Sequence, residues 1–215
     1  MNGVFKQLGK GICTEKLNNL FKMFCEDPLW DANLTWYTDN PDFTTCFHQT
    51  VLVYVPLALL IVLGAFEFNY ARKSKDRQIP WTPLNITKLV INIALIVLVV
   101  IDFIYEVSNQ VASVHVVSSV CKLATYLLSQ LIWATCKRRG LVTSSALFYF
   151  WTVALLFGGV TFRSVILSQQ VFGPVWPFST YLIQYPLVVV MFFLNCFADA
   201  RPLKVDIDGE TNWMQ

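Results

Sequence analysis

Two apolar runs decide the fold of this chain: VLVYVPLALLIVLGAF at residues 51–66 and LVINIALIVLVVI at residues 89–101. Hydrophobic residues make up 55% of the 215 positions and charged residues only 14%, whereas about a quarter of an average soluble domain is charged. A helix needs about 20 mostly apolar residues to cross a hydrocarbon core about 30 Å thick. The sequence therefore predicts an all-α membrane protein.

Similar stretches recur as far as the C-terminal end of the chain. We predict a bundle of five transmembrane helices at residues 47–70, 88–105, 111–136, 145–167 and 176–197. The apolar runs are continuous rather than alternating, which favours helices over a β-barrel. The predicted organisation is an extracellular segment at residues 1–46, a five-helix domain at residues 47–197 and the start of a cytoplasmic linker at residues 198–215.

The orientation follows from lysine and arginine, because cytoplasmic loops carry an excess of both. Residues 27–46 contain four aspartates and no lysine or arginine, whereas the loops after the first and third predicted helices are basic. This pattern predicts an N-terminus outside the cell and a C-terminus in the cytoplasm. The basic residues concerned are Arg72, Lys73, Lys75, Arg77, Lys137, Arg138 and Arg139.

The predicted outer segment carries two cysteines, Cys25 and Cys46, on the oxidising side of the membrane, where disulfides persist. A bridge between them would close a loop of about 20 residues and stabilise the fold by about 3 kcal/mol. Two free thiols are the alternative, and Cys13 also allows a different pairing. The loop contains the glycosylation sequon of Asn33, whereas a second sequon at Asn85 lies on the cytoplasmic side and is expected to stay unmodified.

Several motifs follow one another between about residues 24 and 200. They are Asp27-Pro28-Leu29-Trp30-Asp31, Asn33-Leu34-Thr35-Trp36, Asn40-Pro41-Asp42-Phe43-Thr44, Lys137-Arg138-Arg139-Gly140, Arg163-Ser164 and Cys196-Phe197-Ala198-Asp199. In this order they closely resemble the N-terminal region of the multidrug resistance-associated proteins, the long ABC transporters of subfamily C. The residues before Phe24 do not share the resemblance, and the chain ends where the linker of that family begins.

The resemblance implies an accessory domain of five helices, followed in that family by a linker, two six-helix transport domains and two ATPase domains. It implies glycosylation at Asn33, a Cys25–Cys46 disulfide, and a role in trafficking, retention and partner contacts. The implied partners are the lipid bilayer and the linker and transmembrane core of an ABC transporter, or another membrane protein. Export of organic anions and glutathione conjugates would belong to the whole transporter. The expected location is the plasma membrane, with a vacuolar or other endomembrane as the alternative.

The chain offers no residues for catalysis or cofactor binding. Its only Gly-Lys pair, Gly9-Lys10, has Val4 and Gly11 where a phosphate-binding loop requires glycine and serine or threonine. We therefore expect no ATP bound by this chain, no cofactor and no enzymatic activity. The two histidines, His48 and His115, have no second metal ligand at helical spacing, and no basic and aromatic stripe suits nucleic acid.

Three charges fall inside the predicted helices: Asp102, Lys122 and Arg163. A charge at the centre of a membrane helix costs about 2.5 to 3.5 kcal/mol, so such residues usually have a role. We expect Asp102 to pair with Arg163, or with Lys122, and to hold the helices in register. An ion or proton pathway is the alternative. Glu67, Lys88 and Asn195, near the inner helix ends, are expected to be solvated or interfacial.

Two classes of function remain at this point. The first is the non-enzymatic accessory domain of an ABC exporter. The second is a free-standing polytopic membrane protein that acts as a small transporter, a channel subunit or a regulatory adaptor. Continuation of the reading frame into a linker, more membrane helices and two phosphate-binding loops would separate them.

Overall fold

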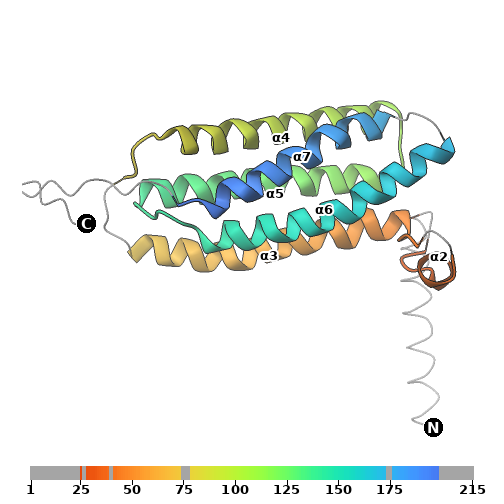
Figure 1. The fold of residues 1–215 in the computed structure, drawn as a ribbon, viewed down its shortest axis with the longest axis horizontal. Helices are drawn as coiled ribbons and strands as arrows, with labels where there is room; N and C mark the ends of the chain where they lie inside the picture. The colour runs from red at the N-terminus through yellow and green to blue at the C-terminus, as the bar shows by residue number, and fades with distance from the viewer. Residues whose placement is uncertain (1–24, 26–27, 39–40, 74–77, 173–175, 199–215) are drawn as a thin grey trace, which may run out of the picture.

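The computed structural model describes residues 25, 28–38, 41–73, 78–172 and 176–198, and for residues 168–172 and 176–179 it describes the backbone alone. This part of the chain consists of helices and their connections (Figure 1). Cys13, the N-terminal lysines and the acidic C-terminal tail lie outside the described residues. The helices are α2 (Ala32–Trp36), α3 (Thr45–Lys73), α4 (Pro83–Ser108), α5 (Ser113–Arg138), α6 (Ser145–Phe172) and α7 (Trp176–Cys196).

Four of these helices are long and apolar enough to cross a membrane: α3, α4, α5 and the Ser145–Leu167 part of α6. In α7 the apolar stretch with described side chains, Thr180–Cys196, is shorter. The prediction of an all-helical, multi-pass membrane protein is confirmed. The helices also lie where the apolar runs place them, although most of them extend further at one or both ends.

Helix α4 shows why hydropathy alone places the start of a helix too late. It begins at Pro83, five residues before the predicted start at Lys88. Thr82 is the N-cap, and its hydroxyl accepts a hydrogen bond from the Asn85 N–H at 3.3 Å. Proline suits the first turn of a helix because it lacks the N–H that would have no partner there. The polar first turn is therefore helical, and Lys88 lies within the helix rather than at its end.

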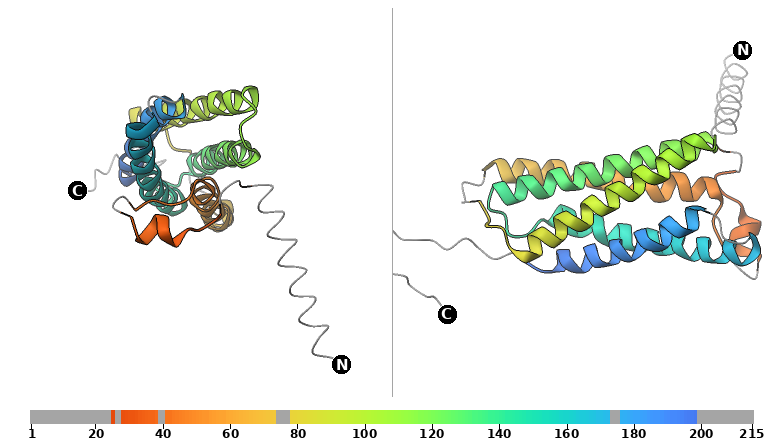
Figure 2. Two further views of the ribbon diagram at one scale, coloured as in Figure 1. Left: turned by 90° about the vertical axis from the view of Figure 1, so that its right-hand side faces the viewer. Right: turned by 90° about the horizontal axis from the view of Figure 1, so that it is seen from above.

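The five long helices form a ring. Helix α5 packs against α3 and α4, α6 packs against α3 and α7, and contacts between α4 and α7 close the ring. Weaker contacts join α5 and α6 across the middle. Figure 2 shows this arrangement from the end of the bundle and from above, with α2 outside the ring beside the N-terminal end of α3.

Large side chains fill the middle of the bundle. Trp151 is 1% exposed, stacks on Tyr126 with ring centroids 6.2 Å apart, and makes an edge contact with Phe150 at 4.8 Å. Leu60 and Leu95 complete this core from α3 and α4. The outward faces are also apolar, since Phe66 and Leu156 are 70% and 62% exposed. A soluble protein rarely shows such a surface, whereas lipid requires it.

The turn at the end of α5 has a clear local cause. Gly140 has a positive φ of 74°, which glycine adopts without steric cost. The Leu141 N–H donates to the Cys136 carbonyl at 3.0 Å, and the Gly140 N–H donates to the Lys137 carbonyl at 3.3 Å. These are the two bonds of a Schellman motif. The glycine of the Lys137-Arg138-Arg139-Gly140 motif therefore ends the helix directly after its basic residues.

Candidate functional site

The outer segment is attached to the helical ring by covalent and polar contacts. Cys25 and Cys46 form a disulfide, with Cα atoms 5.7 Å apart. The Thr44 hydroxyl donates to the Leu29 carbonyl at 2.9 Å. The ring of Trp30 packs on Phe43 and Phe47, with centroids 5.6 and 5.8 Å away. The described residues before α3 are therefore attached to the bundle. These aromatic contacts add apolar area that the disulfide alone would not provide.

Helix α2 holds the Asn33 sequon in a defined geometry. The Asp31 carboxylate caps the helix by accepting the Asn33 N–H at 2.9 Å. The Thr35 hydroxyl interacts with the carbonyls of Asp31 and Asp42 at 2.8 and 3.3 Å, and Thr35 is buried. Asn33 is exposed. The asparagine of the sequon therefore points away from the protein, while its threonine faces the bundle.

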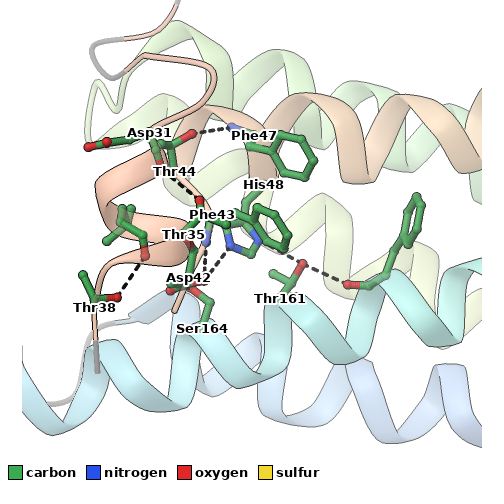
Figure 3. A network of polar contacts seen from close by, with 12 residues as sticks. Asp31, Thr35, Thr38, Asp42, Phe43, Thr44, Phe47, His48, Thr161 and Ser164 are labelled. Carbon is green, nitrogen blue, oxygen red and sulfur yellow. Dashed lines mark hydrogen bonds and ion pairs between the residues drawn. The ribbon is translucent and has the colours of Figure 1, made fainter. Parts of the chain in front are cut away.

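Asp42 and His48 form the centre of the junction between the outer segment and α6 (Figure 3). The Asp42 carboxylate lies 3.2 Å from His48 Nε2 and accepts the Ser164 hydroxyl at 2.6 Å and the Phe43 N–H at 2.8 Å. His48 Nδ1 lies 3.4 Å from the Thr161 hydroxyl. Because a carboxylate only accepts hydrogen bonds, the hydrogen between Asp42 and His48 belongs to Nε2. The junction joins the outer segment, α3 and α6.

A cavity of about 100 Å³ lies on the membrane side of this junction, between α3, α5, α6 and α7. His48 forms part of its wall, together with Lys122, Tyr126, Thr161 and Gln184. Apolar residues such as Leu52 and Pro56 complete the lining. The space exceeds the roughly 10 to 15 Å³ that a single water molecule needs, but most of its lining is apolar.

The charges inside the bundle belong to a cluster between α4, α5 and α7. The Asp102 carboxylate is hydrogen-bonded to Thr180 and interacts electrostatically with Lys122 and Glu106. Glu106 in turn accepts the Ser119 hydroxyl at 2.7 Å. Lys122 thus has two carboxylates in its surroundings, although neither forms an ion pair with it within 4.0 Å. Of the two partners expected for Asp102, the structure places Lys122 nearby.

The expected pairing of Asp102 with Arg163 is wrong. The Arg163 side chain is exposed and makes no ion pair within 4.0 Å with any carboxylate in the described ranges. The reason is the phase of α6: Thr161 and Ser164 face the junction, and Phe162 stacks on Tyr185 at 4.7 Å. With about 100° between successive residues, Arg163 lies on the remaining, outward face. Helices α4 and α6 are also not neighbours in the ring.

At the other end of the bundle, Glu67 of α3 caps the first turn of α6. Its carboxylate accepts the Ser145 hydroxyl at 3.0 Å and the Ala146 N–H at 3.4 Å, and Cys136 Sγ lies 3.9 Å away. An anion at a helix N-terminus also interacts favourably with the helix dipole. Glu67 was expected to be solvated or interfacial, but it joins α3, α5 and α6.

Two further residues at this end have specific partners. The Lys137 ammonium lies 2.7 Å from the centroid of the Trp81 ring and 5.5 Å from that of Trp133, and the Lys137 carbonyl accepts the Ile79 N–H at 3.1 Å. Lys88 is only 6% exposed and donates to the Phe197 carbonyl at 3.5 Å. Lys88 was expected to be solvated or interfacial, but its side chain is buried at this end of the bundle, because α4 begins five residues before it.

No group of three or more histidine, cysteine, aspartate or glutamate side chains could hold a metal ion within the described ranges. His48 belongs to the junction, and His115 lies in the first turn of α5. The junction itself could not be predicted from the sequence, which indicated only an acidic outer segment and an interfacial histidine. Its two halves do fall within the motifs Asn40-Pro41-Asp42-Phe43-Thr44 and Arg163-Ser164, which was the available signal.

Comparison with known proteins gives these features a context. The model of the ABC transporter TMD0 domain matches residues 22–179, a range that begins before Cys25 and includes α2 to α6. Over 191 residues the chain is 30% identical to ATP-binding cassette sub-family C member 3 of Rattus norvegicus, covering 85% of this chain and 12% of that protein.

Relatives in other species are similar. The chain is 30% identical over 181 residues to ATP-binding cassette sub-family C member 3 of Homo sapiens, covering 80% of this chain. It is 25% identical over 185 residues to sub-family C member 2 of Mus musculus, covering 82% of this chain. In both cases the match covers 12% of the relative. The chain therefore spans a small part of the length of these proteins.

Proposed function

Because this chain belongs to the ABC transporter TMD0 domain family, we propose that it serves the trafficking, retention and partner contacts of a sub-family C exporter, and not the transport step itself. The observation that supports this proposal best is the extent of the family match, which includes both the helices and the attached outer segment. The export of organic anions and glutathione conjugates, and the ATP that drives it, would belong to the remainder of the transporter.

The inner end of the bundle supports a contact with the following linker. Lys88 holds the carbonyl of Phe197 directly after α7, so the chain leaves the bundle at a fixed point. Glu67 and the Trp81–Lys137 contact order the neighbouring helix ends. A surface whose polar groups are already arranged loses less entropy when it binds a partner. We therefore place the contact with the linker and transport core at this end.

The proposed topology has five crossings, with the outer segment outside the cell. Helix α7 contains 21 residues, which at about 1.5 Å per residue match a hydrocarbon core of about 30 Å. Arg72, Lys73 and Arg138 lie in the last turns of α3 and α5, where the positive-inside rule places the cytoplasm. The disulfide lies at the opposite end, as an oxidising exterior favours. The proposed location is the plasma membrane.

Glycosylation at Asn33 is part of this proposal. Asn33 is exposed on α2, whereas the Asn85 side chain is only 1% exposed inside the bundle. A folded domain of this shape has no room for a glycan on Asn85 on either side of the membrane. The absence of a glycan at Asn85 is therefore uninformative about orientation. Only Asn33 reports the side on which the outer segment lies.

Deletion of residues 1–197 from a full-length transporter that contains this chain tests the proposed role. We expect the fraction of transporter at the cell surface, measured by biotinylation, to fall several-fold. The ATP-dependent export of a glutathione conjugate into membrane vesicles, normalised to the amount of transporter, should stay close to the wild-type value.

Co-expression of the chain as a separate polypeptide is the control, and it should restore surface delivery. A normal surface fraction combined with a loss of normalised export would place the chain in the transport step and contradict the proposal. Ion flux through liposomes that contain only this chain would instead favour a small transporter or channel subunit.

A further inference from the structure

Helix α2 presents an asparagine and two large aromatic side chains on one face. Asn33 and Trp36 stand at positions i and i+3 of α2, which are neighbours on the surface of a helix, and Tyr37 is the C-cap residue, whose N–H donates to the Asn33 carbonyl at 3.2 Å and so lies one turn beyond Asn33. Trp36 is 72% exposed and Tyr37 is 81% exposed. Two aromatic rings with so much apolar area in water are unusual, and here they lie next to the asparagine of a glycosylation sequon.

The direction of this face is fixed by the opposite side of the helix. Thr35, two residues after Asn33, is only 8% exposed and is bound to the carbonyls of Asp31 and Asp42. Two residues correspond to about 200° of rotation around a helix. The face with Asn33 and the two rings therefore points away from the bundle. Figure 2 shows α2 outside the ring of long helices, where nothing described covers it.

We propose that Trp36 and Tyr37 form a stacking platform for the first N-acetylglucosamine of an N-linked glycan on Asn33. The face of a pyranose ring presents polarised C–H groups, and the face of an aromatic ring is electron-rich, so the two attract each other. Stacking would also remove apolar ring surface from water. The proposal rests on the outward orientation proposed above, since only an outer Asn33 receives a glycan.

The glycan is a better occupant of this face than the bilayer. A hydrophilic glycan on Asn33 has to extend into water, and Trp36 and Tyr37 share the face from which it extends. Rings that anchor a protein in a bilayer would have to point toward the lipid, where a hydrophilic glycan does not extend. Trp30 differs from both, because it packs on Phe43 and Phe47 and is only 45% exposed. The platform therefore consists of Trp36 and Tyr37.

The test uses the full chain, produced in mammalian cells and purified with its glycan. Peptide-N-glycosidase is added without denaturant, and both the rate of glycan release and the melting temperature before and after release are measured. The variant is Trp36→Ala combined with Tyr37→Ala. The control is Tyr70→Ala, which removes a ring that is 65% exposed at the other end of α3.

We expect several-fold faster glycan release from the double variant than from the wild type or the control. Glycan removal should lower the melting temperature of the wild type and the control and leave that of the double variant unchanged. Trp36→Phe keeps a ring and should restore slow release, which separates stacking from misfolding. Equal release rates and equal losses of melting temperature in all variants would overturn the platform.

Two other outcomes are decisive. Quenching of Trp36 fluorescence by brominated phospholipids, taken as the difference between the wild type and Trp36→Phe, would place the ring in the bilayer and overturn the proposal. A wild-type protein without a glycan on Asn33 would overturn both the platform and the outward orientation. A glycan on Asn33 that is energetically independent of the two rings would overturn the platform and leave the orientation intact.

Discussion

At the scale of single residues, Asp42 has the largest share in joining the outer segment to the bundle. Its two carboxylate oxygens accept hydrogen bonds from the Ser164 hydroxyl, the His48 ring and the backbone N–H of Phe43. Ser164 lies 122 positions further along the chain. Hydrogen bonds to a charged acceptor are stronger than those between neutral groups, and partners left without an acceptor lose more than the bond itself.

Asp42→Ala should therefore lower the free energy of unfolding by about 1 to 3 kcal/mol. The substitution leaves the Ser164 hydroxyl and the His48 ring without their acceptor, and the outer segment should exchange amide hydrogens faster. Denaturation in detergent, combined with hydrogen exchange of the segment, measures both effects. Thr38→Ala is the control, because Thr38 bonds only to the Leu34 carbonyl at an exposed site. Equal losses in the two variants would contradict the assigned role of Asp42.

The sequence predicted which residues of this site are chemically unusual, but not their partners. Asp102 and Lys122 lie near each other without an ion pair within 4.0 Å, because α4 and α5 are neighbours in the ring. Arg163 has a different environment: it precedes Ser164 by one residue, which corresponds to about 100° of rotation around the helix, and it therefore points outward. Hydropathy carries no information on phase when both faces of a helix are apolar.

At the scale of helices, the apolar runs predicted the type and the approximate length of the elements, because lipid sets the length of a spanning helix. The ends could not be predicted as well. Thr82 and Pro83 start α4 early, and Gly140 ends α5 with a Schellman motif. The first turn of α6 has one local acceptor, the Ser144 hydroxyl, which takes the Leu147 N–H hydrogen bond at 3.3 Å, and one from a different helix, since Glu67 of α3 accepts the Ala146 N–H at 3.4 Å. A contact between residues that are 79 positions apart leaves no local signal in the sequence.

Glu67→Ala should lower the free energy of unfolding by about 1 to 2 kcal/mol, because it removes the acceptor of the Ala146 N–H and the link between α3 and α6, although Ser144 still accepts the Leu147 N–H. Glu67→Gln should cost less, since an amide oxygen still accepts hydrogen bonds but lacks the charge that the helix dipole favours. Chemical denaturation followed by circular dichroism measures the difference. Ser145→Ala, which removes the hydroxyl contact alone, is the control and should cost least. Wild-type stability in Glu67→Ala would contradict the assigned cap.

At the scale of the whole molecule, the order of helices in the ring is what the sequence could not predict. All helices are apolar on their outward faces, so composition does not tell which of them are neighbours. The cysteines, the sequon and the acidic character of the outer segment all predict that it lies outside the cell. In the structure this segment is disulfide-bonded and attached to α3 and α6, which explains why the family match extends beyond the helices.

In the proposed topology this chain crosses the membrane five times, with its outer segment and its C-terminal end on opposite sides. Epitope tags at the two ends, probed by antibodies on cells before and after permeabilisation, test this claim most directly. With five crossings, we expect labelling of the N-terminal tag on intact cells and of the C-terminal tag only after permeabilisation. Labelling of both tags on intact cells, or of neither before permeabilisation, would contradict it.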